Sequence, residues 1–188
     1  MWKFADDTTI CNVFSNPDAC SLQECVQHVA EWSKTNLFQL NPTNCKEMVI
    51  CFKKHFPALD PVEVNGQSLE RVSTAKILGV TFRNDLKWND HVDLITSKAA
   101  KRVYLLRQLK RAEVNAKDLI GFYCSCIRSV LEYACQVFHC SLTNYLWHEI
   151  ERIQKRAMHI IYPDLSYADA IVKADLPSLV NRRDSFMQ

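Results

Sequence analysis

The segment Phe4-Ala5-Asp6-Asp7-Thr8-Thr9-Ile10 places two adjacent carboxylates between residues that favour β-structure. Aspartate is common in tight turns, so the segment predicts a hairpin with Asp6 and Asp7 at its turn. Two ionised aspartates side by side repel each other, and a divalent cation that bridges them relieves this repulsion. The alternative is a solvated turn, because Ala-Asp-Asp is by itself an ordinary turn sequence.

The composition is that of an ordinary globular protein. The 188 residues are 48% apolar and 23% charged with a net charge of +2, so a surface for nucleic acid must come from a local cluster. Three glycines are too few for a dinucleotide-binding or phosphate-binding loop. Nine cysteines without a signal peptide indicate reduced thiols, as expected in the cytoplasm or nucleus and not in a secreted protein. No apolar run approaches the length of a membrane span, so we expect no membrane partner.

The amino-terminal half alternates between helical and β patterns. Asn65-Gly66 is the dipeptide that a type I′ hairpin turn favours. Gly79 lies inside an apolar run, where it suggests a bulge or a close backbone approach. The expected elements are a helix over about 20–37, strands over 47–52 and 75–82, and a hairpin over 62–69.

From Trp88 onward the apolar residues recur with helical spacing, which predicts three amphipathic helices packed as a bundle. The fold class expected is therefore α+β, with a small β-hairpin and helix region at 1–83 and an all-α region at 84–188. The three stripes are Val92, Ile95, Ala99, Val103, Leu106 and Leu109; Leu119, Tyr123, Ile127, Val130, Ala134 and Val137; and Leu146, Ile150, Ile153, Ala157 and Ile160.

The order of several short motifs resembles the end of a LINE-type (non-LTR retrotransposon) reverse transcriptase. The resemblance covers almost the whole chain, and each motif is weak without the others. The motifs are Phe4-Ala5-Asp6-Asp7, Leu40-Asn41-Pro42, Cys45-Lys46-Glu47-Met48, Leu78-Gly79-Val80, Leu86-Lys87-Trp88-Asn89-Asp90-His91, Ile127-Arg128-Ser129-Val130-Leu131-Glu132-Tyr133 and Ile150-Glu151-Arg152-Ile153-Gln154-Lys155-Arg156-Ala157.

The resemblance implies roles for particular residues. Asp6 and Asp7 would be catalytic carboxylates that bind Mg²⁺ in a partial palm domain, within 1–83. Residues 77–82 would grip the primer end, and 88–162 would form the thumb on an RNA/DNA template–primer duplex. Nucleotides would be the only small-molecule ligands. A fragment of this kind is expected to be inactive alone, because the family's other metal carboxylate and its fingers lie upstream of the matched part. Asn44 also stands where the family usually has a lysine.

A stretch without acidic residues, Thr96–Arg111, carries the candidate contacts for nucleic acid. Basic side chains with an interleaved tyrosine, Tyr104, suit the phosphates of a duplex. The alternative is a solvated helix face whose long side chains cover apolar surface. The residues are Lys98, Lys101, Arg102, Arg107, Lys110 and Arg111.

Other patterns favour simpler interpretations. The cysteines and histidine within 124–140 lack a Cys-x-x-Cys pair, so buried thiols in a helix core explain them better than zinc does. His91-Val92-Asp93 has the ligand spacing of 2-oxoglutarate dioxygenases, and 75–111 resembles a segment of AlkB-type tRNA-modifying proteins. The motif opens a predicted helix and not a jelly-roll strand, which argues against that activity. The rival hypotheses are a non-catalytic helical domain that binds nucleic acid or protein, and a relic without function.

Overall fold

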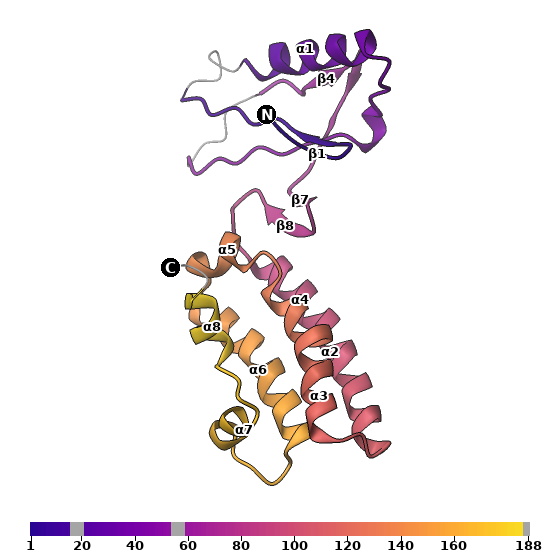
Figure 1. Ribbon diagram of the computed structural model, residues 1–188. Coiled ribbons are helices and arrows are strands. Elements are labelled where there is room, and N and C mark those ends of the chain that lie inside the picture. The colour runs from indigo at the N-terminus through magenta and orange to yellow at the C-terminus, as the bar shows by residue number, and fades with distance from the viewer. Residues whose placement is uncertain (16–20, 54–58, 186–188) are drawn as a thin grey trace. The chain divides into compact units, whose positions relative to one another are not determined.

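The computed structural model describes residues 1–15, 21–53 and 59–185, which form helices and small two-stranded sheets (Figure 1). The predicted α+β class is confirmed. Packing divides the chain into two units, the first made of Met1–Ala75 with Arg83–Leu86 and the second of Lys76–Phe82 with the chain from Lys87 onward. Within the described residues no helix is both long and apolar enough to cross a membrane.

Two hairpins in the first unit have turns of two residues. Strand β1 (Trp2–Phe4) pairs antiparallel with β2 (Asp7–Thr9), which leaves Ala5 and Asp6 in the turn. Strand β4 (Glu63–Val64) pairs with β5 (Gln67–Ser68) around Asn65 and Gly66, whose φ angles are +52° and +77°. Positive φ at both positions is the type I′ geometry, so this prediction is confirmed.

The first unit also contains, within its described residues, a helix, α1 (Leu22–Thr35), a 3-10 turn, η2 (Pro42–Asn44), and a pair of very short parallel strands. These strands are β3 (Lys46–Glu47) and β6 (Glu70–Arg71). The predicted strand over 47–52 is wrong beyond Glu47. Its residues are β-prone, but a strand needs a partner, and β6 offers only two residues to pair with.

Polar contacts hold much of the first unit together. The Gln23 side chain donates to the Glu63 carbonyl at 3.0 Å and accepts from the Glu63 amide at 2.9 Å, which attaches α1 to β4. The apolar core beside this contact contains three buried valines, Val26, Val62 and Val64. The first unit therefore has a thin hydrophobic core for its length.

The predicted strand over 75–82 is a hairpin instead, with β7 (Thr74–Ile77) and β8 (Val80–Arg83) on either side of Leu78 and Gly79. The φ angles of these two residues are +46° and +85°, so Gly79 belongs to a tight turn and not to a bulge. A Cβ at Gly79 would lie 3.1 Å from the Tyr133 ring, so the suggested close approach is present. Tyr133 also donates to the Leu78 carbonyl at 2.8 Å.

The second unit is a helical bundle in which α2 and α6 pack side by side against a third, irregular helical stretch (Figure 1). Short helices α7 and α8 follow α6. Its elements are α2 (Asn89–Arg111), α3 (Ala116–Phe122), η3 (Tyr123–Arg128), α4 (Ser129–Glu132), α5 (Cys135–Phe138), η4 (His139–Ser141), α6 (Asn144–Ile161), α7 (Tyr167–Lys173) and α8 (Leu179–Ser185).

The stripes predicted on α2 and α6 are confirmed, with only Leu109 and Ile160 partly exposed at their ends. The middle stripe is right as far as Ile127. After it, Val130 and Ala134 are only partly buried against the core and Val137 is 50% exposed, whereas Leu131 is fully buried, so the buried face is displaced by one residue from the predicted stripe. The cause is η3, a π-helix whose backbone bonds run from residue i to i+5. Each turn of η3 holds an extra residue, so the buried positions continue in steps of four.

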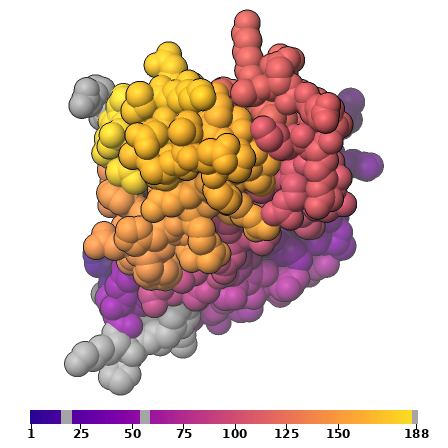
Figure 2. All heavy atoms as spheres, turned by 90° about the horizontal axis from the view of Figure 1, so that it is seen from below, coloured from indigo at the N-terminus to yellow at the C-terminus, as the bar shows by residue number. Residues whose placement is uncertain are grey.

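Figure 2 views the helical unit from the end at which α7 lies. There the chain from α6 to α8, coloured orange to yellow, and the region of α2 and α3, coloured red, form one continuous surface. The packing of α6 on α2, α3, α7 and α8 explains this continuity.

Candidate functional site

The predicted carboxylate pair lies on the β1–β2 hairpin, and both side chains are exposed. Asp6 is in the turn, and Asp7 is the first residue of β2, opposite Phe4. The adjacent Ala5 has a φ of +51°, a left-handed conformation that costs an L-residue about 1 kcal/mol. A positive φ is expected in a two-residue hairpin turn, so this geometry explains how the two carboxylates are held next to each other and is not itself a sign of function.

The two faces of this hairpin differ. Lys3 projects toward α1, where its Nζ lies 5.6 Å from the Trp32 ring centre and 5.3 Å from that of Phe38. Alternation along a strand puts Trp2 and Phe4 on the opposite face, together with Asp7, the cross-strand partner of Phe4. Trp2 and Phe4 are 67% and 65% exposed, so the Asp7 carboxylate shares a surface with two exposed aromatic rings.

The donor set fits a partial magnesium site. Mg²⁺ is usually bound through one or two carboxylates, with substrate phosphates and water completing its octahedron, and Asp6 and Asp7 can supply the carboxylates. Nowhere in the part of the chain that the structure describes do three His, Cys, Asp or Glu side chains gather in a way that could hold a metal ion. A complete two-metal site would therefore need carboxylates from elsewhere.

The six basic residues predicted on α2 do not form one surface. Lys98, Lys101 and Arg111 are exposed, and Arg107 is half-buried. Arg102 donates to the Cys126 carbonyl within the π-helix η3. Lys110 donates at 3.1 Å to the carbonyl of Ile161, at the negative end of α6.

Arg102 and Lys110 thus serve the packing of the bundle. Replacing either one would disturb the fold, so neither is suited to a test of nucleic-acid binding. The exposed residues Lys98, Lys101 and Arg111 remain as candidates for phosphate contacts, beside the exposed ring of Tyr104.

A second basic surface, which was not predicted from the sequence, lies on α6. Its members recur at intervals of three or four residues, so they share one face of the helix, and all are exposed. The spacing i, i+4, i+7, i+8, i+11 was visible in the sequence and could have indicated it. We define the α6 stripe as His148, Arg152, Lys155, Arg156 and His159.

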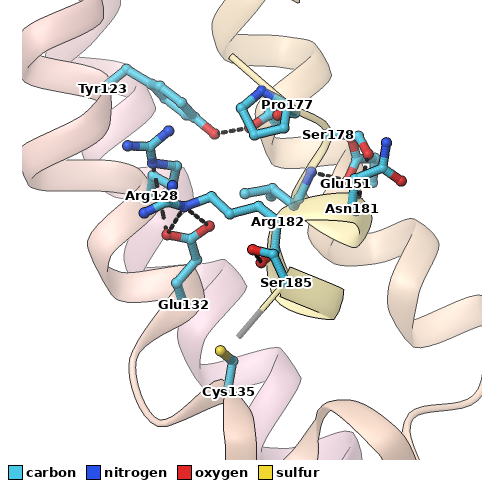
Figure 3. A network of polar contacts seen from close by, with 12 residues as sticks. Tyr123, Arg128, Glu132, Cys135, Glu151, Pro177, Ser178, Asn181, Arg182 and Ser185 are labelled. Atoms are coloured by element: carbon cyan, nitrogen blue, oxygen red, sulfur yellow. Dashed lines mark hydrogen bonds and ion pairs between the residues drawn. The ribbon is translucent and has the colours of Figure 1, made fainter. Parts of the chain in front are cut away.

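The interior of the bundle holds a network of buried polar groups that joins α8 to α4 and α6 (Figure 3). Glu132 pairs with Arg182 at 2.8 Å and lies 3.7 Å from Arg128. Glu151 accepts hydrogen bonds from the Tyr167 hydroxyl and, at 3.2 Å, from the Leu179 amide. These contacts fix the carboxyl-terminal helix in place.

Burial changes the acidity of several groups in this network. Desolvation raises the pKa of Tyr123 and of Tyr167, so both phenols stay protonated and act as hydrogen-bond donors. Arg183 is fully buried, and its pKa is lowered by desolvation, although Glu151 opposes the change. The network is therefore structural, since its carboxylates are occupied by partners within the fold.

His91 belongs to the core. Its ring is 1% exposed and packs against Trp88 and Phe138, and its Nδ1 accepts from the Thr81 amide at 3.3 Å. Burial lowers the pKa of His91, which favours the neutral ring that this hydrogen bond requires. Asp93 is exposed two residues further along α2, so the structure gives no support to an iron site.

The chain is similar to a Drosophila melanogaster protein described as "Probable RNA-directed DNA polymerase from transposon BS". The two are 27% identical over 163 residues, which is 84% of this chain and 18% of the relative. The similarity supports a relationship to transposon reverse transcriptases. The chain spans less than a fifth of that relative's length. No family model matches the sequence, and no solved structure matches it.

Proposed function

We propose that this chain is the carboxyl-terminal palm and thumb portion of a LINE-type reverse transcriptase, and that it contributes to RNA-directed DNA synthesis only together with the rest of such a polymerase. The observation that carries the proposal is the similarity over 84% of the chain to a transposon RNA-directed DNA polymerase. The exposed carboxylate hairpin at Asp6 and Asp7 supports it, because this is where the resemblance puts the metal site.

In this proposal Asp6 and Asp7 hold Mg²⁺ from one side of the polymerase site. The bound metal would lower the pKa of the primer hydroxyl and neutralise charge on the nucleotide phosphates. The chain's own contribution is to hold two carboxylates on a short turn whose direction the β1–β2 pairing fixes. Lys98, Lys101 and Arg111 would contact phosphates of the template–primer duplex from α2, the principal thumb helix.

Polymerase assays test the catalytic part. The chain alone should not incorporate nucleotides with Mg²⁺, template and primer, because two carboxylates on one hairpin cannot complete a two-metal site. Joining the palm and fingers of a related element to it should give activity, provided that Asn44 is tolerated. In that chimera Asp6→Ala should abolish incorporation, whereas Asp93→Ala, at an exposed aspartate of α2, should not.

The chimera also separates catalysis from binding. Asp6→Ala should leave duplex affinity unchanged, because its carboxylate acts on the metal and not on the duplex. Polymerisation by the unextended chain, well above that of a double Asp6→Ala, Asp7→Ala variant, would show that the proposal misjudges what the chain lacks.

A second candidate is a helical module that binds nucleic acid without catalysis. It is favoured by the core of the second unit, which is extensive and includes fully buried residues from α2, η3 and α6. Binding of an RNA–DNA duplex, measured by fluorescence anisotropy, should fall steeply with salt, and each lost phosphate contact should reduce the slope by about 0.9.

Charge reversal identifies the surface in both candidates. Lys101→Glu on α2 should weaken duplex binding, whereas the same change at Lys34, an exposed lysine of α1, should have a smaller effect. Equal affinities for the Lys101→Glu variant and the unmodified chain would leave α2 as a solvated face.

A further inference from the structure

The α6 stripe is a continuous band of potential cations. Over its carboxyl-terminal part, from Arg152 to Ile161, α6 contains no acidic residue. Arg152 contacts Glu149 at 2.6 Å, yet its side chain remains 71% exposed. Long basic side chains lined up along one helix face suit a chain of phosphates, whose spacing they can follow by rotating.

A groove of about 420 Å³ runs beside this stripe, between α6 and the segments that contain α7 and α8. His148 and Lys155 line the groove and also belong to the stripe. Its volume is within the range of about 300–1,000 Å³ that is typical of small-ligand sites. The other lining residues are Asn144, Trp147, Glu151, Tyr167, Ser178 and Val180.

Two aromatic rings, Trp147 and Tyr167, line the groove. The Trp147 ring is stacked on His139 with 5.2 Å between centres and 10° between planes, so it is held from behind. Lys155 Nζ lies 5.4 Å from the Tyr167 ring centre, which places a cation at the rim of the groove. Aromatic walls beside a basic rim are the two components that proteins use to bind single-stranded nucleic acids.

The groove is unfavourable for a phosphate. Glu151 lines it, and its negative charge would repel a phosphate, although both of its oxygens already accept hydrogen bonds, from the Tyr167 hydroxyl and the Leu179 amide. Figure 3 shows Glu151 close to Ser178, whose hydroxyl accepts from the Asn181 amide at 3.2 Å and can donate to a base edge. Phosphates are therefore favoured on the stripe, and a base is favoured in the groove.

We infer that the α6 stripe and this groove bind single-stranded nucleic acid, with phosphates along the stripe and one unpaired base in the groove. A duplex cannot use the groove, because its bases are stacked and paired. This inference extends the proposed function, on which it rests for the choice of nucleic acid as the polyanion, and it assigns unpaired nucleotides to a different helix from the one proposed for the duplex.

The test measures anisotropy of a fluorescein-labelled 12-nucleotide oligouridylate and of an RNA–DNA duplex of the same length with the full 188-residue chain. Val180→Phe fills the groove without changing charge, and should lower the affinity for the oligouridylate about tenfold, as expected for one lost stacked base. Val172→Phe, at a valine of α7 that is 79% exposed and outside the groove, is its matched control and should have no effect.

The charge arm pairs Lys155→Ala, Arg156→Ala on α6 with Lys98→Ala, Lys101→Ala on α2, all at exposed positions. The α6 pair should reduce the salt dependence of oligouridylate binding by about 1.4 in log–log slope, about 0.7 for each lost contact. The α2 pair should act mainly on the duplex. If Val180→Phe lowers the melting temperature, the alanine pairs on α6 and α2 provide the test instead, because their side chains lie on the surface and their replacement should not unfold the chain.

Two results would overturn the inference: an α6 pair that weakens the oligouridylate no more than the α2 pair does, or a folded Val180→Phe variant with unchanged affinity. In either case duplex binding that depends on Lys98 and Lys101 would leave the proposed function standing. Loss of oligouridylate binding through α6 with no duplex binding at all would support the inference and count against the proposed thumb role of α2.

Discussion

The two units of this chain are stabilised in different ways. In the helical unit, apolar side chains from α2, η3, α6 and α8 are fully buried in one core. Among the described residues of the first unit, the buried apolar cluster consists of three valines, and polar contacts such as that between Arg71 and Glu47 connect its short strands. Large side chains there, including Trp2 and Phe52, remain exposed. Burial therefore supports one unit far more than the other.

This difference predicts which part of the chain should unfold locally first. Local opening costs least where few apolar contacts are lost, and the first unit has few to lose. The largest expected contrast is thus between the units of the unmodified chain. Limited proteolysis should cut within residues 1–70 before it cuts the bundle, as followed by mass spectrometry. Early cleavage inside Leu119–Val137 would show that the helical unit is not the more stable of the two.

A buried charge should greatly lower the stability of the helical bundle. Ile127 is fully buried in η3, and Ile127→Asp would place an unpaired carboxylate in the core, at a cost on the order of 4 kcal/mol. Thermal unfolding followed by helical circular dichroism should show a large fall in melting temperature. Ser125→Asp, on the exposed side of the same π-helix, is the control. An unchanged melting point for Ile127→Asp would mean that this core is wrongly assigned.

The first unit should be sensitive to a polar change instead. Arg71 donates to Glu47 at 3.3 and 3.1 Å and to the carbonyls of Leu59 and Asp60 at 3.1 and 3.2 Å. Arg71→Met leaves the buried Glu47 carboxylate without this partner, which should cost about 2 kcal/mol, less than for a fully buried pair because Arg71 is partly exposed.

Protease sensitivity of the first unit is the measurement for Arg71→Met, with the melting temperature of the bundle unchanged. Lys46→Met is the matched control, since the Lys46–Glu70 pair is exposed and should contribute at most about 1 kcal/mol. Equal sensitivity of the two variants would show that the buried pair has no special role.

Acid should weaken the bundle through His91. Its pKa is lowered by burial, so as the pH falls below about 6.5 the unfolded chain takes up the proton first and stability is lost. His91→Gln, which can still accept from Thr81, should lose about 1 kcal/mol less between pH 7.5 and 5.5. Denaturant midpoints at the two pH values measure this, and parallel curves for both proteins would refute it.

The smallest expected effect comes from replacing one residue with a left-handed backbone in each unit. Ala5 and Ala134 have φ angles of +51° and +53°, which glycine adopts without the penalty of a Cβ. Ala5→Gly and Ala134→Gly should each stabilise their own unit by about 0.5–1 kcal/mol. The first change should appear as slower proteolysis of the first unit, and the second as a higher melting temperature of the bundle. Ala100→Gly, inside α2, should have the opposite sign. Destabilisation by both turn variants would show that the left-handed conformation costs little here.

Local chemistry allowed correct predictions where it alone determines the structure. Asn65-Gly66 gave the right turn type, and the spacing from Val92 to Leu106 gave the buried face of α2. Leu78 adopts a left-handed conformation that its side chain does not favour, so the β7–β8 turn had only Gly79 as a signal. The strand predicted over 47–52 failed because pairing depends on residues far away in sequence.

For the candidate site residues, the hairpin position could be predicted from the sequence, but the arrangement on α2 could not. Asp6 and Asp7 were expected together, and both lie exposed on one hairpin. Spacing on α2 could not reveal that Arg102 and Lys110 turn toward carbonyls of other helices, because those partners come from η3 and α6. A run of charges along a sequence therefore overstates the surface that it provides.

The π-helix η3 affects how this chain should be aligned with its relatives. In an α-helix, positions four residues apart rotate by about 40° per step, yet Leu119, Tyr123, Ile127 and Leu131 all stay fully buried. The segment behaves as an α-helix that has gained one residue and absorbed it within Tyr123–Arg128. A relative with a regular helix here should align with a single-residue gap in that range. Without the gap, its core residues would be matched to surface positions from Ser129 onward.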